Sequence, residues 1–172
     1  MKTPTVRTIA LVAVMAAVVC VLTSIVHVPT PTPAGYVHLG DIGANFAALA
    51  FGPGPGFLIA GGGMAIADLL TAGAASWAPG TLVVHGLQAV VVAIIGRNRK
   101  PWVMFLAATA GGVVVVVGYL LYAWLFMGMT LAAAFAEVPY NILQVAVGLL
   151  GVLVYLLVAR AYPPLTRWAD RD

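Results

Sequence analysis

The stretch GRNRK, at residues 96–100, holds three of the eight lysine and arginine residues of the chain and separates two apolar runs. The run before it covers about residues 81–95, and the run after it covers about residues 101–127. A helix that crosses a membrane needs about 20 mostly apolar residues, so the second run is long enough and the first is short. We therefore predict that residues 96–100 connect two membrane helices at a membrane surface.

The composition of the whole chain supports this interpretation. Of the 172 residues, 63% are hydrophobic and only 8% are charged, whereas a soluble domain carries about 25% charged residues. The chain therefore lacks the charge to cover a surface in water, and we expect a protein embedded in the lipid bilayer. The single cysteine, Cys20, excludes an internal disulfide and a cysteine-rich zinc cluster. The formal net charge of +3 indicates orientation in a membrane rather than binding to nucleic acid.

Four further apolar runs predict helices over about residues 6–28, 41–51, 57–71 and 139–162. The stretch GPGPG at residues 52–56 predicts a tight turn between two of them, because glycine and proline interrupt regular structure. The first run is too long for the apolar part of a signal peptide, so we expect it to be retained. The sequence thus predicts an all-α integral membrane protein, a single domain over residues 1–172 with a bundle of six transmembrane helices.

The basic residues predict how this bundle is oriented. In a six-span arrangement both chain ends and residues 96–100 face the same side of the membrane. All lysine and arginine residues of the chain lie in these three places: Lys2, Arg7, Arg97, Arg99, Lys100, Arg160, Arg167 and Arg171. Because basic residues concentrate on the cytoplasmic side, we predict that both termini are cytoplasmic.

Polar residues gather at the opposite side, at spacings that place them on shared helix faces. They are Asp41 with Asn45, His85 with Gln88, and Glu137 with Asn141 and Gln144, while Asp68 lies within an apolar run and Tyr36, His38 and Trp77 lie in the outer connections. Polar side chains are costly in hydrocarbon, so we expect them to face the bundle interior or a wet cavity. This set predicts an outward-facing pocket for a small polar molecule.

Structural roles are open for the charged members of this set. Asp41 and Glu137 lie at predicted helix starts, where a carboxylate can cap the helix or interact with its dipole. Asp68 lies inside a run where capping is not available, and a tyrosine hydroxyl is a possible structural partner. His85 can be a core histidine whose hydrogen bonds are satisfied.

Structural roles are also open for the neutral members. Asn141 and Gln144 can form hydrogen bonds between helices. Tyr36, Trp77 and Tyr140 can belong to the aromatic belt at the membrane interface, or one or two of them can stack on a flat ligand. These alternatives are not separated by the sequence pattern, and the clustering on one side is what favours a pocket.

The connection PTPTPAGYVHLGD, at residues 29–41, combines three prolines with polar and aromatic residues. The prolines disfavour helix in the residues before them and predict an extended, stiff arm. Gly35 and Gly40 allow turns at its far end. Such an arm can lie across the outer mouth of the bundle and bring Tyr36, His38 and Asp41 to it, although a plain rigid linker fits the same residues.

Four stretches together resemble the substrate-binding S components of energy-coupling factor (ECF) vitamin transporters. GYVHLGD (35–41) resembles the first outer loop of that family, and LAFGPGPGFLIAGGGMAIADLL (49–70) resembles its hairpin of the second and third helices. WAPGTLVVHGLQAVVVAIIG (77–96) resembles the fourth helix, in which many relatives carry lysine where this chain has His85. VPYNILQVAVGLLG (138–151) resembles the sixth helix.

The resemblance implies a non-enzymatic binding subunit in a prokaryotic plasma membrane, with an outer pocket that the loop between helices one and two closes. It also implies partners, namely a transmembrane T component and two ATPase subunits that use ATP. This chain has no G-x-x-x-x-G-K-[ST] stretch and so supplies no nucleotide hydrolysis itself. Members of the family dock on the T component through small residues of helix one, and Ala13 and Ala17 fit that pattern.

The resemblance implies a small water-soluble vitamin or vitamin precursor as substrate, of the thiamine-pyrimidine, riboflavin or queuosine-precursor type. A secondary transporter or channel for a small polar solute is the alternative, but no internal repeat is visible. A membrane enzyme is disfavoured, because Ser24 and Ser76 are the only serines and neither lies in a nucleophile motif.

We predict that residues 96–100 are cytoplasmic and that the connection at 29–40 faces outward. Single cysteines at Ala34 and Arg99 test this when intact cells are treated with a thiol reagent that does not cross membranes. The cysteine at position 34 is expected to react and the one at position 99 is not. Labelling of position 99 alone would contradict the predicted orientation.

Overall fold

The computed structural model describes residues 5–32 and 35–170, and helices make up most of them. In chain order they are α1 (Val6–Ile25), α2 (Gly40–Phe51), α3 (Pro53–Phe57), α4 (Gly63–Leu70), α5 (Ala78–Gly96), α6 (Pro101–Leu125), α7 (Leu131–Ala136), α8 (Val138–Gly148) and α9 (Leu150–Ala161). A π-helical turn, η1 (Leu58–Gly62), joins α3 to α4, and a 3-10 helix, η2 (Pro163–Asp170), follows α9. Two short strands, β1 (Val28–Pro29) and β2 (Tyr36–Val37), precede α2.

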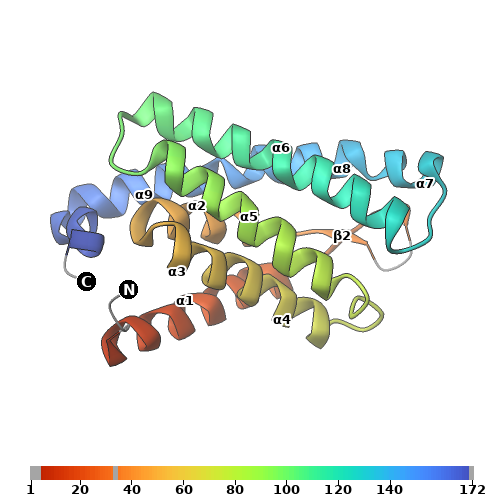
Figure 1. Cartoon of the computed structure of the whole chain (residues 1–172), viewed down its shortest axis with the longest axis horizontal. Coiled ribbons are helices and arrows are strands. Elements are labelled where there is room, and N and C mark those ends of the chain that lie inside the picture. Colours follow the sequence, from red (N-terminus) through yellow and green to blue (C-terminus); the bar gives the residue numbers. More distant parts are fainter. Residues whose placement is uncertain (1–4, 33–34, 171–172) are drawn as a thin grey trace.

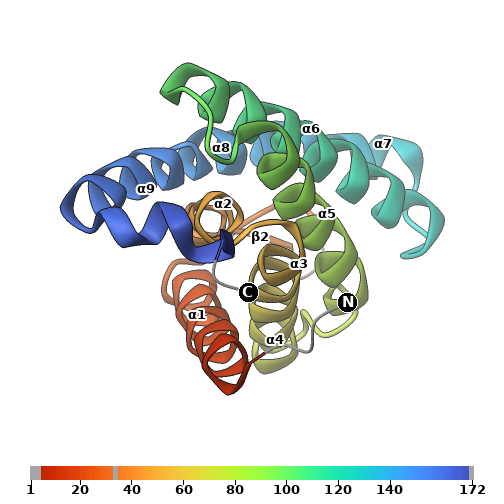
Figure 2. The same ribbon diagram turned by 60° about the vertical axis from the view of Figure 1, so that its left-hand side comes forward.

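Helix α2 forms the centre of the bundle. It contacts α1, α3, α5, α8 and α9, and Figure 2 shows it enclosed by these elements. Its sequence, GDIGANFAALAF, is rich in glycine and alanine, and nearly all of its residues are buried. Small side chains let neighbouring helices approach closely, which explains how so short a helix is surrounded on every side.

Five helical segments are long and apolar enough to cross a membrane. They cover Val6–Ile25, Pro53–Leu70, Ala78–Gly96, Pro101–Leu125 and Leu131–Ala161. The sixth predicted helix is present as α2, but its 12 residues extend only about 18 Å, which is shorter than the hydrocarbon layer of about 30 Å. A helix therefore occupies each predicted segment, while the structure supports five spans by length and composition.

Two local predictions need correction. The chain turns between two helices within GPGPG, as predicted, but it does so at Gly52 alone, with a φ of 87°, and the next helix begins at Pro53 rather than at Phe57. Proline is favoured at the first helical position because it has no N–H to leave unpaired there. The connection before α2 is a small hairpin rather than an extended arm, since β1 pairs with β2 in antiparallel register. Pro33 lies outside the described residues.

The connections of the bundle separate into two ends. Figure 1 shows the start of α1, the α5–α6 connection and the end of α9 at one end, with the β1–β2 hairpin and α7 at the other. We call these the basic end and the hairpin end. Arg7, Arg97, Arg99, Lys100 and Arg160 lie in the segments of the basic end. Lys2 and Arg171 lie outside the described residues. The basic residues in the described part of the chain thus share one end, which agrees with the predicted clustering of basic residues.

The apolar core lies beneath the hairpin end and extends toward the basic end. Its buried side chains come from α1, α2, η1, α4, α5, α6 and α9, and include Leu49, Ile59, Met64, Val92, Met104, Val152 and Tyr155. By contrast, only Val19 and Thr23 of α1 are buried, so α1 packs on the bundle with a small part of its surface.

Two adjacent glycines in η1 differ in their surroundings. A Cβ atom placed on Gly61 would collide with the carbonyl oxygen of Leu82 and lie 3.1 Å from the backbone nitrogen of Gly86. A Cβ atom on Gly62 would have no neighbour within 4 Å. Gly61 therefore permits the close packing of η1 on α5, whereas Gly62 does not contribute to it.

We expect Gly61→Ala to destabilise the protein by about 1–3 kcal/mol, because the rigid backbone of α5 must move away. For a chain of this size, that loss lowers the melting temperature in detergent by roughly 2–12 °C. Gly62→Ala is the matched control and is expected to be neutral or stabilising, since alanine favours helix over glycine by up to about 1 kcal/mol. Equal melting temperatures of the two variants would contradict the proposed packing.

Candidate ligand-binding site

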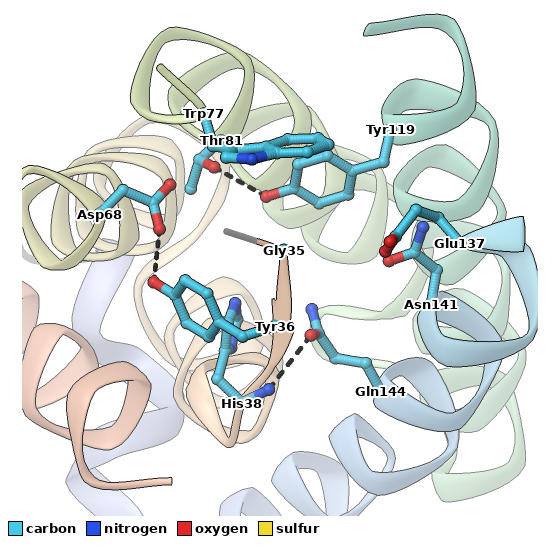
Figure 3. A pocket seen from close by; sticks show the side chains of 10 residues that line it. All are labelled: Gly35, Tyr36, His38, Asp68, Trp77, Thr81, Tyr119, Glu137, Asn141 and Gln144. Atoms are coloured by element: carbon cyan, nitrogen blue, oxygen red, sulfur yellow. Dashed lines mark hydrogen bonds between the residues drawn. The ribbon is translucent and has the colours of Figure 1, made fainter. Parts of the chain in front are cut away.

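A pocket opens at the hairpin end, between the β1–β2 hairpin and the ends of four helices. Its empty space, including the part open to solvent, is about 410 Å³. The lining residues come from the hairpin, α4, the start of α5, α6 and α8, and Figure 3 shows them: Gly35, Tyr36, His38, Asp68, Trp77, Thr81, Tyr119, Glu137, Asn141 and Gln144. The enclosed part of this space is much smaller than the whole, so a ring-sized ligand requires the hairpin or the lining side chains to move.

The hairpin forms because its few backbone hydrogen bonds are local. Val28 pairs with Val37 and Pro29 with Tyr36. The backbone N–H of Thr30 donates to the carbonyl oxygen of Gly35 at 3.0 Å. Proline has no backbone N–H, and it is tolerated at position 29 because this strand lies at the edge of the two-stranded sheet. This pairing places Tyr36 at the edge of the pocket.

Three lining side chains hold the hairpin in place from other elements. The hydroxyl of Tyr36 donates to Oδ1 of Asp68 in α4 at 2.5 Å. The backbone N–H of His38 donates to Oε1 of Gln144 in α8 at 3.3 Å. Both the hydroxyl and the backbone N–H of Thr32 donate to Oε1 of Glu137, the backbone donor lying 3.2 Å away. We call these bonds the hairpin contacts, and they link the loop to the pocket wall through groups that also line the pocket.

The hairpin environment shifts two pKa values. Burial raises the pKa of the Tyr36 hydroxyl, and the hydrogen bond and negative charge of Asp68 raise it further. Burial lowers the pKa of His38 from 6.5 to about 3, against a smaller opposing effect of Asp41. Nδ1 of His38 accepts a hydrogen bond from the backbone N–H of Gly40 at 3.1 Å, which requires an unprotonated nitrogen. Both side chains are therefore neutral near neutral pH.

Aromatic rings form two opposite walls of the pocket. Trp77 and Tyr119 lie on one side with ring centroids 5.9 Å apart, and Tyr36 and His38 lie on the other. The hydroxyl groups of Tyr119 and Thr81 are 2.8 Å apart, which fixes the Tyr119 ring. The two rings on each side are tilted to one another, by 64° for Trp77 and Tyr119 and by 59° for Tyr36 and His38. Aromatic rings pack well in such tilted arrangements, so these walls suit a ligand with an aromatic ring.

Seven of the eleven residues predicted from the sequence line this pocket: Tyr36, His38, Asp68, Trp77, Glu137, Asn141 and Gln144. Asp68 has the tyrosine partner that the sequence left open, and it also faces the pocket. Glu137 is the N-cap residue of α8 but makes no side-chain cap bond there. Its carboxylate instead accepts hydrogen bonds from Thr32 of the hairpin. The position of Glu137 at the start of a helix does not predict this partner.

The other four predicted residues lie outside the lining, where Asp41 and Asn45 bond to other helices and Gln88 bonds to His85 within α5. His85 Nδ1 lies 3.1 Å from Oδ1 of Asp41 and 2.6 Å from Oε1 of Gln88, and the Asn45 side chain donates to the carbonyl of Gly148 at 2.9 Å. The N-cap residue of α2 is Leu39, so the capping interpretation of Asp41 is wrong. These four residues form a buried polar layer next to the pocket.

Sequence reasoning missed Gly35, Thr81 and Tyr119. Thr81 precedes His85 by four residues, so the helical spacing already used for His85 and Gln88 would have included it. Tyr119 lies in the long apolar run of α6, and nothing in its neighbourhood marks it. The described residues contain no group of three or more His, Cys, Asp or Glu side chains placed to hold a metal ion.

The fold and the site together define a helical integral membrane protein with a polar, aromatic pocket closed by a hairpin at one end. A sequence model described as the S component of ECF-type riboflavin transporters matches residues 3–162, and the chain belongs to this family. This finding confirms the resemblance noted in the sequence and identifies the family as transporter components rather than enzymes.

Two relatives cover most of the chain. A Pyrococcus woesei protein described as "Uncharacterized protein in gap 3'region" is 36% identical over 148 residues, which are 84% of this chain and 97% of that protein. The thiamine precursor transporter HmpT of Lactococcus lactis subsp. cremoris (strain MG1363) is 31% identical over 152 residues, which are 86% of this chain and 84% of HmpT.

Two solved structures share the fold. The S component of a bacterial ECF transporter has a TM-score of 0.68 at 17% identity, over 92% of this chain and 96% of that chain. The S-component for biotin from an ECF-type ABC transporter has a TM-score of 0.63 at 16% identity, over 97% of this chain and 93% of that chain. At such low identities the likeness concerns the fold alone.

We predict that His38 makes the folded protein less stable as the pH falls from about 6.5 toward about 3. Between these values the unfolded chain binds more protons than the folded chain, at a cost of up to about 1.4 kcal/mol per pH unit. His38→Asn keeps an acceptor for the Gly40 N–H but does not titrate. Its melting temperature should fall less than that of the wild type between about pH 7.5 and about pH 5, and parallel curves would contradict the burial of a neutral His38.

Proposed function

We propose that this protein is the membrane-embedded, high-affinity substrate-binding subunit of an ECF-type importer in a prokaryotic plasma membrane. Its substrate is a small water-soluble vitamin or vitamin precursor with a heteroaromatic ring. The observation that carries this proposal is the pocket at the hairpin end, in which buried polar groups from separate helices converge between two aromatic walls. Such a site suits a small ligand that has few polar groups and a flat apolar body.

The position of the pocket supports uptake from outside the cell. The pocket lies at the end opposite the basic connections, and basic residues mark the cytoplasmic side in membrane proteins. A hairpin fixed by only a few hydrogen bonds can open this end to an outer substrate. With both termini at the basic end, the proposed arrangement has six helices, of which α2 is the short central one.

The choice of substrate class draws on the relatives. The family model names riboflavin, and HmpT is named as a transporter of a thiamine precursor. Both are heteroaromatic compounds, and the two aromatic walls suit a planar ring. Precursors of queuosine belong to the same heteroaromatic class and remain candidate substrates under this proposal.

The chain requires partners for active transport. S components of ECF transporters work with a T component and two ATPase subunits, and we propose the same partners here, with ATP used by the ATPases and no cofactor in this chain. Helix α1 supports this proposal, because most of its surface is exposed along its length. Ala13 and Ala17 both lie on the exposed face and offer a docking surface of small side chains.

We expect the tagged wild-type protein to copurify with ATPase subunits from its own host, and Ala13→Trp or Ala17→Trp to lose them. A bulky side chain on a close-contact helix face blocks docking, while the pocket at the hairpin end is untouched. ATP-dependent uptake of the vitamin should fall with the copurification, and the melting temperature should not change. Val113→Trp, on the exposed face of α6, is the matched control.

Retention of the ATPase subunits by both α1 variants would exclude this face as the docking surface. Absence of ATPase subunits from the wild-type preparation as well would contradict the assignment to an ECF importer. The docking surface and the importer function are therefore tested by different results.

A further inference from the structure

We infer that the pocket selects a planar heterocycle bearing an amino or cationic nitrogen, and that it rejects ligands bearing carboxylate or phosphate groups. This inference rests on the proposed function and narrows its substrate class. Aminopyrimidines and thiazolium compounds belong to the selected class. Biotin, which is an anion, does not, and riboflavin is neutral.

The first observation is that two acidic side chains line the pocket from different helices. Asp68 of α4 is 3% exposed and Glu137, just before α8, is 5% exposed. Figure 3 shows them on opposite sides of the pocket, with the aromatic walls between them. Buried carboxylates are costly unless they are paired or accept hydrogen bonds, so two in one small pocket require donors.

The second observation is that the hairpin satisfies only part of this requirement. The Tyr36 hydroxyl donates to Oδ1 of Asp68, while Oδ2 of Asp68 is buried and has no hydrogen-bond partner in the described part of the chain. Thr32 occupies Oε1 of Glu137. A ligand amino group that reached Oδ2 of Asp68 would satisfy a buried acceptor whose isolation is otherwise unfavourable.

The third observation is that no basic side chain accompanies these carboxylates. The described residues that line the pocket include no lysine or arginine. Burial holds the pKa of His38 at about 3, so this histidine brings no positive charge near neutral pH. His85 lies next to the residues that line the pocket, and its Nδ1 pairs with Oδ1 of Asp41 at 3.1 Å. A ligand anion would therefore face two carboxylates without a cation to bind it.

The aromatic walls favour the same charge. The rings of Trp77, Tyr119 and Tyr36 line the space between the two carboxylates. The electron-rich face of an aromatic ring attracts a cation, and tryptophan does so most strongly. A positively charged planar ring between these walls would be attracted by the aromatic rings in addition to packing against them. An anion would be repelled by the same electron-rich faces.

Asn141 adds an unpaired hydrogen-bond donor to the side of the pocket that holds Glu137. It follows Glu137 by four residues in the same helical segment, so the two side chains share a face. Nδ2 of Asn141 is buried and has no partner in the described chain. Nδ2 of Asn141 can donate to a ring nitrogen while an amino group on the far side of the same ring reaches Oδ2 of Asp68. An aminopyrimidine in this orientation uses both unpaired atoms at once.

The inference can be tested with the full-length protein purified in mild detergent and four probes. The probes are 4-amino-5-hydroxymethyl-2-methylpyrimidine, thiamine, riboflavin and biotin, measured by calorimetric titration at neutral pH. At least one of the two amine probes is expected to bind about 100-fold more tightly than biotin. Asp68→Asn, which keeps the size of the side chain, should weaken that amine at least tenfold while changing riboflavin affinity by less than about twofold.

Asn98→Gly, at the basic end, is the matched control, because Asn98 has a φ of 59° that glycine adopts without strain. It should bind every probe as the wild type does. Biotin binding as tight as that of both amines, or unchanged amine binding by Asp68→Asn, would overturn the inference and leave the proposed importer function in place. Failure of a cooperatively melting protein to bind either amine would also overturn it. The importer function itself is decided separately by copurification with the ATPase subunits.

Discussion

The cost of placing polar groups inside a hydrocarbon layer governs the arrangement of this protein. With 63% hydrophobic residues, the chain can cover nearly all of its helices with apolar side chains. Its few polar residues must then find partners among themselves or face a wet cavity. They do both at one end of the bundle, where Asp41 of α2 pairs with His85 of α5, and Asp68 and Glu137 bond the hairpin. At the pocket, Oδ2 of Asp68 and Nδ2 of Asn141 have no partner among the described residues and are left for a ligand.

Helix positions could be predicted well, because an apolar run bounded by glycine, proline or basic residues is an unambiguous signal in a membrane protein. The errors came from residues that have two uses. Proline at position 53 begins a helix rather than ending one, since the first helical position needs no N–H. The hairpin could not be predicted from the sequence, because its strands have only two residues each and give no periodic pattern. Hydrogen bonds to α4 and α8 hold it in place, and these depend on the assembled bundle.

The candidate site could be predicted in part for a related reason. Helical spacing shows which residues share a face, but it does not show how far a face lies from the pocket. Asp41 and Asn45 share a face of α2, and that face packs on α5 and the α8–α9 junction rather than lining the pocket. Tyr119 was missed because a single tyrosine in an apolar run of α6 has no periodic partner. Depth and neighbours are properties of the assembled bundle.

The double use of Asp68 and Glu137 has a consequence for the kinetics of the site. Each carboxylate has one oxygen bonded to the hairpin while its side chain also lines the pocket, and Oδ2 of Asp68 has no partner among the described residues. A donor bound to the second oxygen would hold the carboxylate in the position that the hairpin requires, and a closed hairpin would hold it in the position that the donor requires. By thermodynamic linkage, each event strengthens the other by the same factor. The residence time of a ligand would then be set by how often Tyr36 and Thr32 release their acceptors together, and any partner that draws the hairpin away from the bundle would lower the affinity without touching the pocket.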